Sequence, residues 1–178
     1  MAFQSTILIL PGLGSSGPQH WQSVWEREYG FLRVEQHDWE TPVCTDWTTK
    51  LDETIGQFEP GKVILVAHSL ACTTVAYWAQ QYQTKIKGAL LVAPSDTEAD
   101  TYPPGTAGFK PVPLARLPFP SIVVASTNDY YVTSERARLF AHSWGSDFVD
   151  IGDAGHINVA SGFGPWDKGL ELLKVLDK

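Results

Sequence analysis

Three residue types that together can perform nucleophilic catalysis lie far apart in this chain: Ser69, Asp129 and His156. A serine hydroxyl is a weak nucleophile until a histidine accepts its proton, and a carboxylate can hold that histidine in the required tautomer. Each of the three follows an apolar run by a few positions, as expected of residues just beyond buried strands. We therefore expect them to meet at one edge of a parallel sheet, where the carboxyl ends of the strands gather.

The clearest local pattern surrounds Ser69. The apolar, β-branched run at residues 63–66 predicts a strand buried on both faces, and the apolar spacing of three and four over residues 70–82 predicts a helix. A serine at such a junction is typical of the nucleophile elbow, whose usual Gly-x-Ser-x-Gly is here Ala-His-Ser-Leu-Ala at residues 67–71. Alanine adds only a methyl group at each glycine position. The alternative is that Ser69 merely caps a buried helix.

The remaining chain alternates strands with helices. Buried strands are expected at residues 6–10 and 88–92, and further strands at 31–37, 121–125 and 147–151. Helices are expected at about 19–29, 46–58 and 134–144, with a closing helix that has Pro165 at its first position. This alternation predicts an α/β fold: a three-layer sandwich of about six mostly parallel strands with helices on both faces. Its length of 178 residues is typical of a single domain.

The chain order Ser, Asp, His is typical of α/β-hydrolases and differs from that of two other serine hydrolase lineages. In that fold the oxyanion hole consists of backbone N–H groups, and the expected donors here are Leu13 and Leu70. Asp96, just beyond the strand at 88–92, is an alternative acid. We expect His68 to point away from its neighbour Ser69. Neither His68 nor His142, which falls in a predicted surface helix, is placed to be the base.

The loop from Gly12 to Gly17 permits a different hypothesis. It matches Gly-x-Gly-x-x-Gly between a strand and a helix, as in dinucleotide-binding folds, and Asp38 stands near the acidic position that those folds require. The match is weak by itself because the chain has 15 glycines. A Rossmann-like nucleotide-binding domain therefore stays open as an alternative. So does a non-catalytic binding module that kept the hydrolase shape.

Other residues could shape a pocket. Gly12, His20 and Trp21 lie in or just after the glycine-rich loop and could line it, although Trp21 and Trp25 at i, i+4 are also typical of a core pair. Residues 95–120 hold six of the twelve prolines and lack periodicity. Such a long irregular segment could form a small lid over the site.

Composition excludes several classes of partner. The net charge of −7 and the absence of clustered basic residues argue against nucleic acid. Cys44 and Cys72 have neither metal-site spacing nor the density of a disulfide scaffold, and we expect no metal and no cofactor. The apolar run at residues 6–10 is too short for a signal peptide or a membrane span, so we expect no membrane association and a cytoplasmic location.

Five stretches, at residues 10–21, 66–71, 91–94, 126–129 and 155–158, resemble the small serine hydrolases related to retinoblastoma-binding protein 9, and more closely their bacterial relatives. The resemblance implies a compact α/β-hydrolase without a large cap domain, with the triad roles on Ser69, Asp129 and His156. The chain departs from the family at Ala71, where glycine is common. The resemblance supplies no natural substrate, and no residue supports binding to a retinoblastoma-type protein. We expect a serine hydrolase that cleaves small carboxylic esters, or amides, through an acyl-enzyme.

Overall fold

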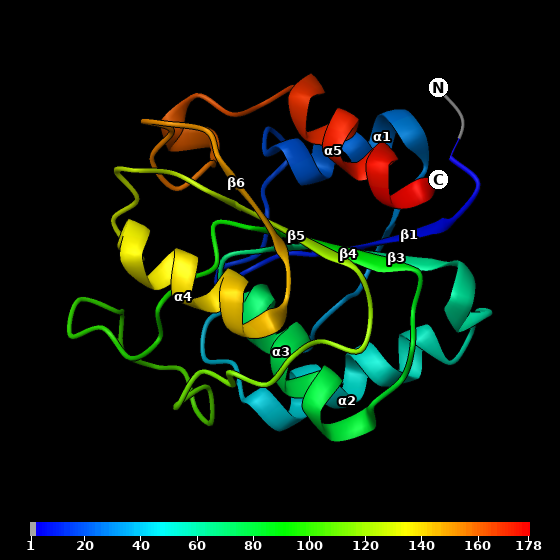
Figure 1. The fold of residues 1–178 in the computed structure, drawn as a ribbon, viewed down its shortest axis with the longest axis horizontal. Coiled ribbons are helices and arrows are strands. Elements are labelled where there is room, and N and C mark those ends of the chain that lie inside the picture. Colours follow the sequence, from blue (N-terminus) through cyan, green and yellow to red (C-terminus); the bar gives the residue numbers. More distant parts are fainter. Residues whose placement is uncertain (1–2) are drawn as a thin grey trace.

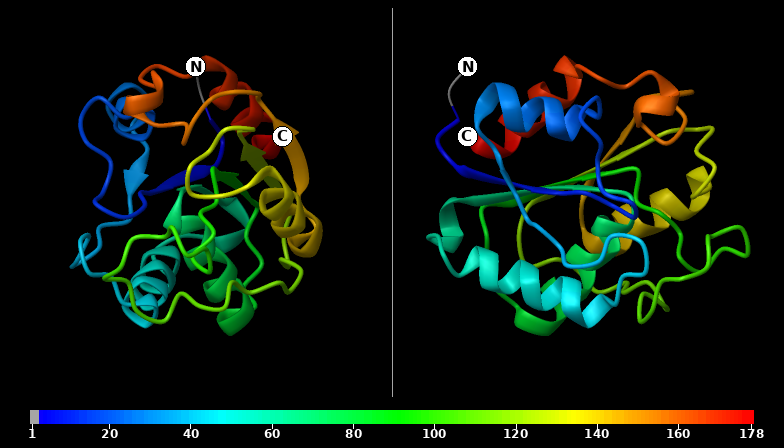
Figure 2. Two further views of the ribbon diagram at one scale, coloured as in Figure 1. Left: turned by 90° about the vertical axis from the view of Figure 1, so that its left-hand side faces the viewer. Right: turned by 180° about the vertical axis from the view of Figure 1, so that it is seen from behind.

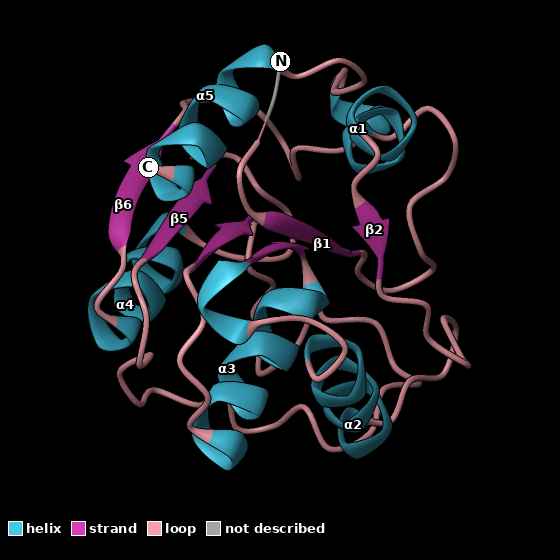
Figure 3. Ribbon diagram, turned by 90° about the vertical axis from the view of Figure 1, so that its right-hand side faces the viewer, coloured by secondary structure: helices cyan, strands magenta, loops and turns pink. Residues whose placement is uncertain are grey.

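The fold is built on one six-stranded parallel sheet (Figures 1 and 3). The computed structural model describes residues 3–178. Its strands are β1 (Thr6–Leu10), β2 (Leu32–Arg33), β3 (Val63–His68), β4 (Gly88–Val92), β5 (Ser121–Ala125) and β6 (Asp147–Asp150), in the spatial order β2-β1-β3-β4-β5-β6. Every neighbouring pair is parallel. All six carboxyl ends therefore lie on the same side of the molecule.

Helices cover both faces of this sheet. One face carries α1 (Trp21–Tyr29) and α5 (Asp167–Asp177), and the other carries α2 (Cys44–Ile55), α3 (Leu70–Tyr82) and α4 (Ser134–Trp144) (Figures 1 and 2). The predicted three-layer α/β-hydrolase-like sandwich is confirmed, and residues 3–178 contain no cap domain. None of the helices in this part of the chain is long and apolar enough to cross a bilayer.

The central strand β3 is buried on both faces because its side chains point alternately into two cores. Ile64 and Val66 face the core that contains the tryptophans of α1. Leu65 and Ala67 face the core formed with α2, α3 and α4. Burial of both faces fixes the register of β3, and so fixes the position of Ser69 at its end.

The second strand is shorter than the predicted 31–37. Only Leu32 and Arg33 pair with β1, and the N–H of Val34 adds one bond to the carbonyl of Ile9 at 2.9 Å. β2 lies at the edge of the sheet, so β1 is its sole partner. Because β1 ends just before Pro11, the chain beyond Val34 has no strand left to pair with.

Three helices begin at other residues than predicted. α1 starts at Trp21, because the Nδ1 atom of His20 accepts the N–H of Gln22 and makes His20 the N-cap. α2 starts at Cys44, whose N–H donates to the carbonyl of Ala107 at 2.9 Å. That contact comes from a distant segment, which local sequence patterns do not reveal. The closing helix α5 starts at Asp167, two residues after Pro165.

Residues 95–120 contain no assigned helix or strand, yet they pack firmly against the α2, α3 and α4 side of the sheet (Figure 1). The side chain of Phe109 is buried. The Tyr77 hydroxyl of α3 donates to the carbonyl of Pro111 at 2.6 Å, and the Trp144 indole of α4 donates to that of Pro113 at 2.7 Å. These bonds give the proline-rich segment a defined course along the body of the molecule.

Candidate active site

Ser69 occupies a sharp turn between β3 and α3. Its backbone has φ 59° and ψ −125°, a conformation that strains any residue other than glycine. The Ser69 N–H donates to the carbonyl of Val92 at 3.0 Å and helps to hold this turn. A Cβ atom on Gly12 would lie 2.8 Å from the Cβ of Ser69. The first glycine of the glycine-rich loop is therefore required because that loop passes directly over Ser69.

The structure brings Ser69, His156 and Asp129 into one line of hydrogen bonds. Ser69 Oγ lies 2.9 Å from His156 Nε2, and His156 Nδ1 lies 2.9 Å from each carboxylate oxygen of Asp129. An ionised carboxylate can only accept, so Nδ1 carries the proton and Nε2 accepts from the Ser69 hydroxyl. The Asp129 side chain is 0% exposed and that of His156 is 9% exposed. This is the arrangement in which a histidine can activate a serine.

Hydrogen bonds with the backbone hold His156 and Asp129 in position. The N–H of Tyr131 donates to Asp129 Oδ1 at 2.8 Å, and the Nε2–H of His68 donates to the carbonyl of His156 at 2.9 Å. His68 therefore does not point away from the site, as the sequence suggested, but contacts the loop that carries His156. The reason is strand alternation: as the last residue of β3, His68 lies on the same face of the sheet as Val66, where Ile157 also packs.

Trp21, predicted as a residue that could line the pocket, lies in the core instead. It is fully buried against the rings of Trp25, on α1, and Trp166, the residue before α5. Its indole N–H donates to the carbonyl of Ile157 at 2.8 Å. Trp21 therefore anchors the residue after His156, while His20 and Gly12 do line the cavity.

The alternative residues are engaged elsewhere. Asp96 forms a two-pronged ion pair with Arg136, at 2.7 and 2.9 Å. His142 is exposed on α4. Asp129, and not Asp96, is thus the carboxylate that contacts His156.

The predicted oxyanion donors, Leu70 and Leu13, both line or adjoin the space beside Ser69. Leu70 is the first residue of α3, so its N–H has no partner within the helix. A Cβ on Gly12 would lie 3.3 Å from that nitrogen, which places the glycine-rich loop beside it. Leu13, the next residue of the loop, lines the cavity. The side-chain amide of Gln22 stabilises this arrangement by donating to the carbonyls of Leu10 and Val66, each at 3.1 Å.

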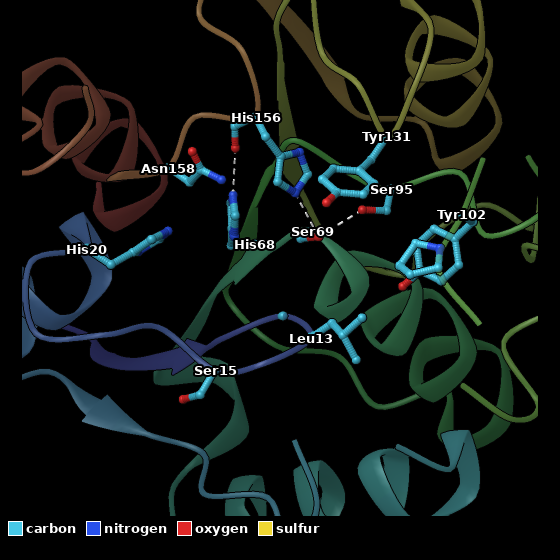
Figure 4. A pocket seen from close by; sticks show the side chains of 12 residues that line it. Leu13, Ser15, His20, His68, Ser69, Ser95, Tyr102, Tyr131, His156 and Asn158 are labelled. Atoms are coloured by element: carbon cyan, nitrogen blue, oxygen red, sulfur yellow. Dashed lines mark hydrogen bonds between the residues drawn. The ribbon is translucent and has the colours of Figure 1, made fainter. Parts of the chain in front are cut away.

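The cavity above Ser69 has a volume of about 190 Å³ (Figure 4). Its lining combines predicted residues with others that the sequence analysis missed: Gly12, Leu13, Ser15, His20, His68, Ser69, Ser95, Tyr102, Pro103, Tyr131, His156 and Asn158. Among the missed residues, Ser95 lies closest to the chemistry, with its Oγ 2.8 Å from Ser69 Oγ. Because the Ser69 proton points to His156, the Ser95 hydroxyl must be the donor of this bond. The ring of Tyr131 lies 4.6 Å from that of His156.

Two further histidines flank His156 and are held neutral. Burial lowers the pKa of His20 to about 4, and electrostatic interactions with His156 and Arg33 add smaller contributions. Burial also lowers the pKa of His68 well below its usual value, with smaller contributions from His156 and His20. Around neutral pH this wall of the cavity therefore offers imidazoles as uncharged hydrogen-bonding groups.

The glycine-rich loop offers little to a dinucleotide. A phosphate bound there would use the free N–H groups at the start of α1, but His20 already accepts that of Gln22. The carboxylate of Asp38, expected to contact a ribose, accepts the N–H groups of Glu40 and Thr41, each at 2.8 Å. Within residues 3–178, no three side chains of His, Cys, Asp or Glu are placed to hold a metal ion.

Comparison with known proteins assigns the family. The family model described as serine hydrolase matches residues 7–175. The chain belongs to the serine hydrolase family. This serine hydrolase is similar to the crystal structure of a proposed YdeN-like hydrolase from Pectobacterium atrosepticum, with 34% identity and a TM-score of 0.86 over 98% of this chain and 91% of that one. The chain is thus a hydrolase by family as well as by fold.

More distant structures share the fold. The ydeN gene product of B. subtilis is 17% identical with a TM-score of 0.76, covering 97% of this serine hydrolase and 98% of that chain. The butyrate-bound esterase Est2 of Thermogutta terrifontis is 19% identical with a TM-score of 0.66, covering 97% and 82%. A search of curated protein sequences gave no match.

Proposed function

We propose that this serine hydrolase cleaves small carboxylic esters through an acyl-enzyme on Ser69, with amides as a less reactive substrate class. One observation carries the proposal: Ser69, His156 and Asp129 are connected by hydrogen bonds of 2.9 Å, and Ser69 opens into a cavity. Such a line of groups activates a hydroxyl for acyl transfer. The groups that surround Ser69 in the cavity fit the same chemistry.

In the acylation half-reaction, Ser69 Oγ forms a bond to the ester carbonyl carbon while its proton passes to His156 Nε2. Asp129 stabilises the imidazolium and keeps Nδ1 protonated. The N–H groups of Leu13 and Leu70 donate to the oxyanion, each contributing on the order of 10²-fold to 10³-fold in rate. The tetrahedral intermediate collapses, the bond to the alcohol oxygen breaks, and His156 gives its proton to the departing alcohol.

In the deacylation half-reaction, water takes the place of the alcohol. His156 Nε2 accepts a proton from a water molecule, whose oxygen forms a bond to the acyl carbon. The acid leaves when the bond to Ser69 Oγ breaks and the proton returns to that oxygen. The backbone of His156 is held by the bond from His68, so the same imidazole is in position for both half-reactions.

The size of the cavity supports small substrates. Its volume of about 190 Å³ lies below the roughly 300–1,000 Å³ typical of pockets for drug-sized ligands. A related fold, the esterase Est2, was solved with butyrate bound, an acid of four carbons. We expect acyl chains of about that length to be preferred over long ones.

A fluorophosphonate probe tests the nucleophile, since it phosphonylates only an activated serine. The probe should add one adduct, and peptide mapping should place it on Ser69 and not on the neighbouring Ser95. Ser69→Ala should abolish both the adduct and the hydrolysis of p-nitrophenyl butyrate. Undiminished labelling or turnover in Ser69→Ala, or an adduct mapped to Ser95, would refute the assignment.

A further inference from the structure

One wall of the cavity carries a hydrogen-bond donor that the proposed chemistry does not use. His20 Nδ1 accepts the N–H of Gln22 at 3.2 Å, so the neutral ring must carry its proton on Nε2. His20 is only 6% exposed, and its Nε2 has no hydrogen-bond partner among the described residues. Figure 4 shows the ring directed toward His68, whose centroid is 4.9 Å away. A buried donor without an acceptor is costly and needs an explanation.

A second donor lies on the same wall. The Oδ1 atom of Asn158 accepts the N–H and the hydroxyl of Ser161, both at 3.1 Å. These bonds fix the orientation of the amide, because only the oxygen can accept them. The NH₂ group is therefore left on the other side, and Figure 4 shows it directed toward His68. His20 and Asn158 both line the cavity, and both carry an N–H donor on the side that faces His68 (Figure 4).

The wall has no charge with which to bind an anion. The lining, drawn from residues 3–178, includes no Lys, Arg, Asp or Glu. Burial keeps the pKa of His20 at about 4, so at neutral pH its ring is uncharged. A carboxylate or phosphate would lose its hydration without a compensating cation. An uncharged oxygen needs only the donors that are present.

We propose that His20 Nε2–H and the Asn158 amide bind a second, uncharged oxygen of the substrate: a hydroxyl, ether or carbonyl oxygen a few atoms from the ester group. This inference rests on the proposed function, since it places the oxygen in the cavity that contains Ser69. Small esters with such an oxygen are then better substrates than alkyl esters of the same length. A pocket built to donate hydrogen bonds discriminates against an analogue that cannot accept them.

Matched ester pairs test this preference. p-Nitrophenyl methoxyacetate and p-nitrophenyl butyrate have acyl chains of equal length, and 2-methoxyethyl acetate and butyl acetate have alcohol chains of equal length. The variant is His20→Asn, because asparagine is a good N-cap and can still accept the N–H of Gln22 while it lacks the Nε2 donor. The measured quantity is the ratio of kcat/KM for the oxygen-containing ester to that for its alkyl partner.

For at least one pair, this ratio should fall by about threefold to tenfold in His20→Asn, the range of one neutral hydrogen bond. The difference in intrinsic reactivity between the two esters is the same for both enzymes and cancels. Ratios unchanged within twofold for both pairs would overturn the proposal and leave His20 as a helix cap whose second nitrogen binds water.

A binding readout separates this proposal from the proposed function. In Ser69→Ala, labelled with ¹⁵N at histidine, methyl methoxyacetate should shift the His20 Nε2 resonance at concentrations where methyl butyrate does not. Equal shifts with both esters would overturn the subsite. If no ester is hydrolysed by the wild type, the proposed function fails, and this titration still decides whether His20 binds the oxygen.

Discussion

Mild acid should destabilise the protein through the imidazole of His20. Burial, followed by electrostatic interactions with His156 and Arg33, lowers the pKa of His20 from its ordinary value of 6.5 to about 4. Between these two values the unfolded chain binds a proton that the folded chain does not. The free energy of unfolding therefore rises with pH in this window. The part that depends on His20 is fully present above pH 6.5 and is lost as the pH falls toward 4.

The magnitude follows from the two pKa values. At about pH 5 the unfolded imidazole is almost fully protonated, while the folded one carries a proton in only about a tenth of the molecules. Relative to about pH 7.5, the resulting loss in the free energy of unfolding is roughly 2 kcal/mol, and it approaches about 3 kcal/mol below pH 4. His68 is also held neutral by burial, so the total loss should exceed the part contributed by His20.

Urea unfolding at about pH 5 and at about pH 7.5, followed by tryptophan fluorescence, measures this loss in the free energy of unfolding. We expect wild type to lose about 2 kcal/mol more than His20→Asn, since the variant keeps His68 and the helix cap but not the ring. His37 is exposed, and His37→Asn is the matched control that should behave as wild type. If His20→Asn and wild type lose the same free energy of unfolding, the reasoning about buried neutral imidazoles is wrong.

Two further substitutions test the geometry of the site. A methyl group on Gly12 would lie 2.8 Å from the Cβ of Ser69, so Gly12→Ala should lower kcat/KM for p-nitrophenyl butyrate by about 10²-fold. Gly17→Ala, where a Cβ would meet no atom within 4 Å, should keep the wild-type value, and equal effects of the two would contradict the close-approach argument. Asp129→Asn should lower kcat by about 10⁴-fold, as expected when the wrong imidazole tautomer is favoured, whereas Asp96→Asn should change stability but not kcat. A larger kcat loss in Asp96→Asn than in Asp129→Asn would reverse the assignment of the acid.

Much of the fold could be predicted because a buried strand shows as an apolar run in its own sequence. The apolar run that ends at His68 is buried on both faces, and its pattern alone identified the central strand. The length of the edge strand β2 could not be predicted from its own residues, since it depends on how far β1 extends. The start of α2 was equally hidden, because the bond from Cys44 to Ala107 joins segments about 60 residues apart.

The site residues could be predicted where they directly follow a strand, because the carboxyl ends of parallel strands meet at one edge of the sheet. The same rule could have found Ser95: β4 neighbours β3 in the sheet, and Ser95 follows its end just as Ser69 follows that of β3. At that strand end only Asp96 was predicted as a candidate site residue. Side-chain contacts were harder to predict, because the position of His68 beside His156 depends on where the loop held by Trp21 places His156. The catalytic roles stay predictions until Ser69 is tested.

The backbone dihedral angles of Ser69 have a consequence for how this enzyme could change over time. The chain adopts at that position a shape that suits glycine better than serine. Replacing the residue by glycine would relax the turn and remove the hydroxyl together. If Ser69 is the nucleophile, as we propose, selection for heat resistance alone would favour an inert protein, and only a continuing demand for turnover would keep the serine in place.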